Sequence, residues 1–420
     1  MSVTRRDHLR LLGGAALSAR VQNAAAPAYN ASALSPYSIV DGGNKKVYIN
    51  SVCVTQSGSW LVSFTCGKDG GMDHYVALRR STDRGRTWGS RIVVRDPDDP
   101  FDCEMGQLLA VPGARRIYQF HIVKNRTFGI RFGRLVFTVS EDDGRTWKGP
   151  DGPGGFYEVN PPAYRLAPNH YGWHLMAPGR ILANGDYILP MNVSTDPRPL
   201  AEIRSEVVFL ISPNIVTERD PRKVKFEFHP RPPSGIAAPI RTKPGESLAQ
   251  EPQVVELSGK RLFCVMRTAN GCVYYTVSED GGRAWRNPAE PLLDRDGGRP
   301  VLNPNCAVPL TKLSRGRYAL LHCNNDGSYG GGKSPFDSAK NRSPVYVSMG
   351  REARGAKQPL EFASPRLLCS IDGYKPEANR RDLTYGALLE DGGEYFHFYN
   401  AVWEDVLVNR VDPAKLEYGA

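Results

Sequence analysis

Three short segments of the chain gather side chains of the kinds that recognise sugars. They are residues 169–174, 303–306 and 322–325, which read NHYGWH, NPNC and HCNN. Amide and imidazole groups hydrogen-bond to hydroxyls, and aromatic rings stack on pyranose faces. We therefore expect His170, His174 and Asn305 to contact a carbohydrate, and either histidine could also act as a base.

The two histidines do not indicate a metal site. His170 and His174 are four residues apart and would share one face of a helix, as zinc-binding pairs do. Gly172 between them and the strand-like context argue against a helix. None of the eight cysteines occurs in a C-x-x-C pair, so a zinc ribbon is not expected either. We expect neither a metal nor another cofactor.

One glycine-rich segment imitates a nucleotide-binding loop. Residues 327–334 fit G-x-x-x-x-G-K-S, but a P-loop must open a helix. Pro335 and Asp337 follow with no apolar period, so we reject nucleotide binding and expect a mobile loop at 325–341.

A repeat in the sequence predicts the strands and turns that must position these residues. The pattern S-x-D-x-G-x-x-W occurs at residues 81–88, 140–147 and 278–285, each time after an alternating, strand-like run. The Asp carboxylate can accept backbone N–H bonds two residues on, and Gly supplies the positive φ of a hairpin turn. The Trp then begins the next strand and can pack between sheets.

The spacing of the repeat predicts a radial, all-β architecture. The first two copies are 59 residues apart, which suits one propeller blade, and the next interval suits two blades with an insertion. We expect one β-propeller over residues 36–416, with six four-stranded antiparallel blades; seven smaller blades are the alternative. No helical periodicity is evident after the N-terminal segment.

Residues 1–26 have the features of an export signal. The paired Arg5 and Arg6 precede a short apolar run and the small residues 24–26, which resembles a twin-arginine signal. A periplasmic or secreted location follows as an expectation. Export would permit disulfides: Cys264 and Cys272 could pair across a hairpin, or the cysteines could be buried thiols.

Charge and hydropathy limit the partners. The formal net charge is +10, and the basic residues are scattered, with no run of five like charges. No nucleic-acid motif and no apolar run of membrane-span length occurs, so neither nucleic acid nor membrane insertion is expected. We expect a monomer that acts on an acidic oligosaccharide or polysaccharide.

The repeats resemble the Asp boxes of the sialidase superfamily, and further segments resemble sialidases in chain order. These segments are residues 250–257, 261–267, 341–348 and 383–392, and 177–190 is similar to a pocket wall. The resemblance implies that Tyr385 is the nucleophile and Glu251 its base. It also implies that Arg267 and Arg342 clamp a carboxylate. The acid/base Asp should lie shortly before residue 78, where Asp73 is preferred over Asp69.

The first strand departs from the family pattern. Sialidases have a third clamp arginine there, but this chain has Tyr48 in the strand VYIN. Losing one such charge-assisted contact would cost about 2–3 kcal/mol of binding. A neutral, partly aromatic lobe at Tyr48 favours another acidic or deoxy sugar over sialic acid itself.

The sequence therefore predicts an exo-acting, retaining glycoside hydrolase on a glycan with an acidic or modified terminal sugar. An anionic sugar repels a carboxylate nucleophile, which is why sialidases use a neutral Tyr. Two other classes remain open. One is a uronate-directed lyase, or a rhamnose-releasing propeller enzyme, that uses His170 or His174. The other is a propeller that binds glycans without catalysis.

Overall fold

The structure, a computed structural model, describes residues 34, 36–44, 46–67, 74–95, 101–125, 133–167, 170–194 and 204–419. The expected export signal at residues 1–26 lies outside the described residues, and so do Asp69 and Asp73. None of the helices in the described part has the length and apolar character of a membrane span.

The described strands form five sheets. The first contains β2 (Val47–Val54), β3 (Trp60–Gly67), β4 (His74–Ser81) and β5 (Ile92–Val93). The second has ten strands: β6 (Phe101–Ala110), β7 (Ile117–Asn125), β8 (Gly133–Ser140), β9 (Tyr157–Glu158), β10 (Arg165–Ala167), β11 (His170–His174), β12 (Arg180–Ile181), β13 (Tyr187–Ser194), β14 (Ser205–Ser212) and β15 (Glu227–His229).

The other three sheets follow in chain order. One contains β16 (Gln250–Glu256), β17 (Leu262–Arg267), β18 (Tyr274–Ser278) and β19 (Glu290–Pro291). The next contains β20 (Leu310–Leu313), β21 (Arg317–His322), β22 (Val345–Glu352), β23 (Leu360–Phe362) and β24 (Arg366–Cys369). The last contains β25 (Leu383–Asp391), β26 (Glu394–Ala401), β27 (Asp405–Val411) and β1 (Ser38–Asp41).

Helix is scarce. The single α-helix among the described residues is α1 (Ser338–Asn341). The 3-10 turns are η4 (Pro162–Tyr164), η6 (Pro221–Lys223), η7 (Ser258–Lys260), η8 (Ser314–Gly316), η9 (Tyr329–Gly331) and η10 (Pro413–Leu416). The all-β expectation is confirmed, and α1 and η9 lie in the stretch expected to be a mobile loop.

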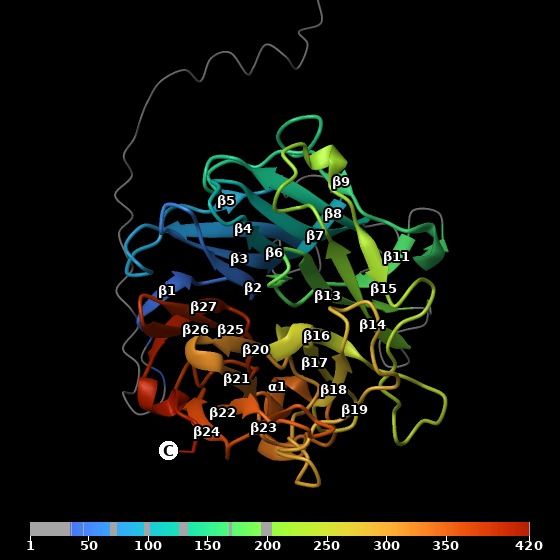
Figure 1. Ribbon diagram of the computed structural model, residues 1–420. Helices are drawn as coiled ribbons and strands as arrows, with labels where there is room; N and C mark the ends of the chain where they lie inside the picture. Colours follow the sequence, from blue (N-terminus) through green and yellow to red (C-terminus); the bar gives the residue numbers. More distant parts are fainter. Residues whose placement is uncertain are drawn as a thin grey trace, which may run out of the picture.

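The sheets follow one another around a centre in chain order, from blue to red (Figure 1). A cavity of about 260 Å³ lies between them, lined by residues of β2, β6, β16 and β25 and by residues from 176–181 and 307–311. The ring closes where β1 pairs antiparallel with β27, with Ser38 opposite Val408. This is a propeller arrangement of mostly four-stranded antiparallel sheets.

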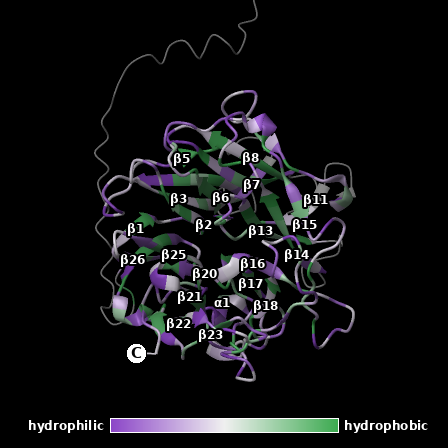
Figure 2. Cartoon of the chain, viewed as in Figure 1, coloured by the Kyte–Doolittle hydropathy of each residue, from purple (hydrophilic) through white to green (hydrophobic). Residues whose placement is uncertain are grey.

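The core lies between neighbouring sheets. Strands such as β14 are buried along their whole length, since each inner sheet face packs on the next sheet. Figure 2 shows green, apolar strands and mostly purple, polar loops. Between the first and last sheets, Trp60 lies with its ring centroid 4.7 Å from that of Phe396. Burial of each such ring contributes roughly 1.5–3 kcal/mol.

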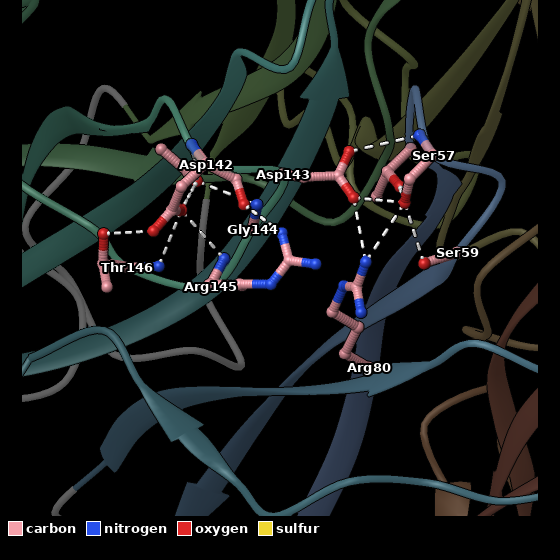
Figure 3. Close-up of polar contacts among 10 residues, drawn as sticks. Ser57, Ser59, Arg80, Asp142, Asp143, Gly144, Arg145 and Thr146 are labelled. Atoms are coloured by element: carbon pink, nitrogen blue, oxygen red, sulfur yellow. Dashed lines mark hydrogen bonds and ion pairs between the residues drawn. The ribbon is translucent and has the colours of Figure 1, made fainter.

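The Asp boxes close turns as expected, with one difference in register. Asp142 Oδ1 accepts the backbone N–H groups of Arg145 at 3.0 Å and Thr146 at 2.9 Å (Figure 3). These donors lie three and four residues on, so the expectation of two residues is wrong. The reason is that Gly144, at φ 83°, turns the chain so that the later amides face the carboxylate.

The boxes also join neighbouring sheets. Asp143 Oδ2 forms an ion pair at 2.9 Å with Arg80 of β4 (Figure 3). The box Trp285 stacks on Phe209 of β14 with ring centroids 3.9 Å apart. Trp packing between sheets, which the repeat predicts, is therefore confirmed.

All eight cysteines are described, and none is disulfide-bonded. Cys264 lies opposite Thr276 in the β17–β18 register, so it does not face Cys272. The register therefore does not support the hairpin pairing that the sequence left open.

Candidate active site

Three inner strands carry a bulge at equivalent places. The pairing register shifts between residues 104 and 107 in β6, 250 and 253 in β16, and 384 and 387 in β25. Within each bulge one residue has a left-handed backbone: Met105 at φ 66°, Glu251 at 50° and Tyr385 at 54°. Such backbone costs about 1–3 kcal/mol per residue, and bulges redirect side chains at functional sites.

Glu251 is fully buried and faces an arginine and a histidine. Its Oε1 atom lies 2.9 Å from Arg267 Nη1 and 3.9 Å from His174 Nε2. The backbone N–H of Glu251 donates to Asn192 Oδ1 at 3.0 Å, which fixes the bulge. Arg267 is held from its other side, because its Nη2 donates to Gln250 Oε1 at 2.8 Å.

The surroundings of Glu251 raise the pKa of its carboxyl group. Burial raises the pKa of Glu251 from 4.5, while the charges of Arg267 and Arg342 and an interaction with the Tyr385 hydroxyl oppose the rise. A carboxylate whose pKa is raised is a stronger base than a free one, so Glu251 is suited to accept a proton.

Tyr385 lies among aromatic rings and beside an arginine. Its ring centroid is 5.6 Å from that of Tyr48 and 6.3 Å from that of Trp403, and the Arg342 guanidinium carbon is 6.0 Å from it. Burial and the charge of Glu251 raise the pKa of Tyr385. The phenol is therefore neutral and needs a base before it can attack.

Arg342 is held by the backbone of a neighbouring segment. Its Nη2 donates to the carbonyl of Asn305 at 2.5 Å, and the Asn305 amide donates to the Thr268 carbonyl at 3.4 Å. Asn305 thus lies at the site but positions Arg342 through its main chain. Among the described residues, the buried Nε of Arg342 has no hydrogen-bond partner, so it can serve an anionic ligand.

Tyr48, which stands where the resemblance leads one to expect a third arginine, belongs to a polar network. The Tyr48 hydroxyl donates to Glu104 Oε2 at 2.7 Å. Glu104 also pairs with Lys124, and His74 Nδ1 lies 3.5 Å away. Burial would raise the pKa of Glu104, but Lys124 and His74 outweigh it and hold that pKa well below 4.5. Burial and the negative charge of Glu104 raise the pKa of Tyr48.

The structure therefore brings together Tyr48, His174, Glu251, Arg267, Asn305, Arg342 and Tyr385 of the predicted site. His174 has a side chain 28 % exposed, and burial together with the charges of Arg267 and Lys124 lowers its pKa to about 3. His170 is the first residue of β11, but its side chain is not described. Asp73 lies outside the described residues.

Sequence reasoning missed Glu104, Lys124, His74 and Asn192. A signal existed for one of them, because Glu104 precedes a bulge whose letters EMGQ resemble QEPQ at residues 250–253. The other three are identified only by contacts between strands: Lys124 contacts Glu104 from the neighbouring strand β7, and His74 and Asn192 make their contacts across sheets. Within the described residues, no group of three or more His, Cys, Asp or Glu residues could hold a metal ion.

Comparisons with known proteins agree with the propeller arrangement of the sheets. The family described as BNR repeat-like domain matches residues 59–398. A search of the curated proteins finds no match.

The similar solved structures include two sialidases. The NanB sialidase of Streptococcus pneumoniae has a TM-score of 0.61 and 14% identity, over 91% of this chain and 71% of that one. A Hadza microbial sialidase, Hz136, has a TM-score of 0.60 and 15% identity, over 89% of this chain and 67% of that one. Another similar structure is that of the α-L-arabinofuranosidase arb93a of Fusarium graminearum, with a TM-score of 0.57 and 13% identity, over 91% of this chain and 99% of that one. The expected kinship with the sialidase superfamily is confirmed.

Proposed function

The chain belongs to the BNR repeat-like domain family, and from that premise and the site geometry we propose a function. The protein is a sialidase-like glycoside hydrolase, exo-acting and retaining, on a glycan that ends in an acidic or modified sugar. The observation that carries the proposal is the interaction of Tyr385 with Glu251 on two bulged strands, with Arg267 paired to Glu251 and Arg342 beside the Tyr385 ring.

The residues divide the reaction into two steps. In the first, Glu251 takes the hydroxyl proton of Tyr385 while the phenol oxygen bonds to the anomeric carbon and the glycosidic bond breaks. Asp73, in our proposal, gives its proton to the leaving oxygen. In the second step water cleaves the glycosyl-tyrosine bond, and the protons return to their starting groups.

The charge distribution argues about the substrate. Arg267 and Arg342 offer two guanidinium groups to a carboxylate. On the Tyr48 side Glu104 is buried, accepts a hydrogen bond from the Tyr48 hydroxyl and pairs with Lys124, so this side offers a phenol in place of a third guanidinium group. A sialoside carboxylate would then be held by two guanidinium groups and not by three, so we propose an acidic or deoxy sugar other than a simple sialoside.

A screen tests the proposal. The purified protein is incubated with aryl glycosides, including a methylumbelliferyl sialoside, and with acidic polysaccharides. We expect release of a terminal sugar from at least one substrate and weak or absent turnover of the sialoside. Sialoside turnover at about 1–10³ per second would contradict the substrate argument. Binding of glycans with no product from any of them would indicate a propeller without catalysis.

A second candidate is a uronate lyase. His174 is partly exposed, neutral because of its lowered pKa, and close to Glu251, so it could accept the proton that a lyase removes from a uronate. A lyase leaves an unsaturated sugar, which absorbs in the ultraviolet. A rise in ultraviolet absorbance during the reaction would therefore favour this candidate over hydrolysis.

The blade count and the cellular location are part of the proposal. We infer six blades. The ten-stranded sheet consists of two halves, which among the described strands are joined only where β8 and β11 pair in parallel through Gly133 and Gly172. Dividing the sheet there gives two blades, which with the other four sheets makes six. We also propose that residues 1–26 direct export to the periplasm or outside, and that the protein acts as a monomer.

A further inference from the structure

A small second cavity lies behind Tyr385. Its volume is about 20 Å³, which is enough for one water-sized molecule. Tyr385 and Gly386 line both this cavity and the central one. Cys306 and Cys323 line it as well, and both are buried.

One asparagine bridges the main chains of the two cysteines. The Asn303 amide nitrogen donates to the carbonyl of Cys306 at 2.8 Å, and its Oδ1 accepts the N–H of Cys323 at 2.9 Å. The two side chains also lie close enough that each shifts the pKa of the other. The remaining cysteines that approach this region do not share that clamp: Cys369 Sγ lies 3.8 Å from His397 Nδ1.

The surroundings activate one thiol of the pair. The interaction with Cys323 lowers the pKa of Cys306, and the positive charges of Arg342 and Arg267 act in the same direction against burial. The thiolate is the nucleophilic and oxidisable form of cysteine. Cys306 is therefore the member of the pair that reacts first.

We propose that Cys306 and Cys323 are a peroxide-sensitive dithiol that closes to a disulfide behind the active site. This site goes beyond the proposed hydrolysis and does not depend on it. The shared cavity, the Asn303 clamp and the mutual contact of the two side chains carry the proposal.

The chemistry balances with hydrogen peroxide as the oxidant. The Cys306 thiolate attacks one peroxide oxygen, so the O–O bond breaks and a sulfenic acid and one water form after protonation. Cys323 then attacks the sulfenic sulfur and expels the second water. Two thiols lose two electrons and two protons, and one peroxide is reduced to two waters.

The bond would act on the substrate clamp. Cys306 follows Asn305, whose carbonyl accepts the hydrogen bond from Arg342. A disulfide between Cys306 and Cys323, which follows β21, would therefore restrain the position of the Asn305 carbonyl relative to the sheet that contains β21. The oxidised and reduced proteins should differ in how firmly Arg342 is held.

Peptide mapping tests the proposal on the full-length protein. The protein is treated with a small excess of hydrogen peroxide, denatured, alkylated and digested. We expect a cross-linked peptide joining Cys306 to Cys323, and a fall in titratable thiols from the eight of the reduced chain to six. The Cys264→Ser variant should give the same cross-link, whereas Cys323→Ser should give none.

Two results would overturn the proposal. One is a wild-type protein that keeps all its thiols or forms only sulfinic acids. The other is a cross-link between different cysteines. The wild-type map decides the matter even if Cys323→Ser does not fold.

Discussion

Glu251 shows how a single residue connects stability to chemistry. Folding places its carboxyl in a buried position beside Arg267, and the net effect is a pKa above the ordinary 4.5. The folded protein therefore binds this proton more tightly than the unfolded chain does. The resulting contribution to stability is present below the ordinary pKa and is lost as the pH rises through the raised pKa.

A comparison with Glu251→Gln measures this contribution. The wild-type free energy of unfolding minus that of the variant should fall as the pH rises from the ordinary pKa of 4.5 through the raised pKa, by roughly 1.4 kcal/mol for each unit of pKa shift. Urea unfolding at a series of pH values gives both quantities. A difference that rises with pH would contradict the assignment, since it would require a depressed pKa.

Arg267 is the second residue whose removal has a stated cost. Arg267→Ala leaves Glu251 buried without its 2.9 Å ion pair, which should destabilise the protein by about 3–5 kcal/mol. It should also abolish turnover of any acidic substrate. Arg351→Ala is the matched control, because Arg351 pairs with Glu361 at an exposed position and should cost under about 1 kcal/mol. Equal losses in the two variants would refute the buried-pair interpretation.

At the scale of the elements, the Asp-box turns were predictable because their chemistry is local. The hydrogen bonds within the second box join residues that are at most four positions apart, such as Ser140 with Asp142 and Asp142 with Thr146. The sequence also placed Glu251, Arg267, Arg342 and Tyr385 in one site through short family motifs.

What the sequence did not reveal depends on contacts between strands. Lys124 meets Glu104 only because β6 and β7 pair in one register, and His74 reaches the same carboxylate from another sheet. A bulge changes that register by one residue, and the partner strand shows no sign of it in its own sequence. The contacts of Lys124 and His74 with Glu104 could therefore not be predicted from local motifs.

Gly144→Ala tests the Asp-box turn. Gly144 has φ 83°, and an added Cβ would lie 2.8 Å from Leu61 Cδ2 in the neighbouring sheet. Gly113 is the control, because it has φ 71° and open space around the added Cβ. In both variants the strained backbone should lower the free energy of unfolding by roughly 1 kcal/mol. In Gly144→Ala the contact with Leu61 should lower it by about 1–3 kcal/mol more. Equal midpoints of thermal unfolding would show that the turn does not press on the next sheet.

At the scale of the whole molecule, the ring depends on a contact between the two ends of the chain. β1 provides the outer partner of β27, and Leu34 just before it is buried in the last two sheets' core. Without β1 the last sheet would expose the edge of β27 to solvent, and neighbouring apolar surface would follow. The inner strands that carry Tyr48 and Tyr385 lie on either side of that closure.

Truncation separates the closure from the segment before it. Removing residues 1–26 should leave the midpoint of thermal unfolding unchanged, whereas removing residues 1–41 deletes β1 and should lower it by several degrees. Circular dichroism melts of the two truncated proteins give the comparison. Indistinguishable melts would mean that the ring is closed by other contacts.

The central claim is that Tyr385 performs nucleophilic catalysis on a glycoside, and Tyr385→Phe tests it most directly. Turnover of the glycoside identified by the screen is measured for the wild type, for Tyr385→Phe and for Tyr318→Phe. Tyr318 donates its hydroxyl to Glu352 at 2.9 Å, away from the pocket, and serves as the control. The account predicts a loss of about 10³-fold or more in kcat for Tyr385→Phe and little change for the control. Wild-type turnover in Tyr385→Phe would contradict it.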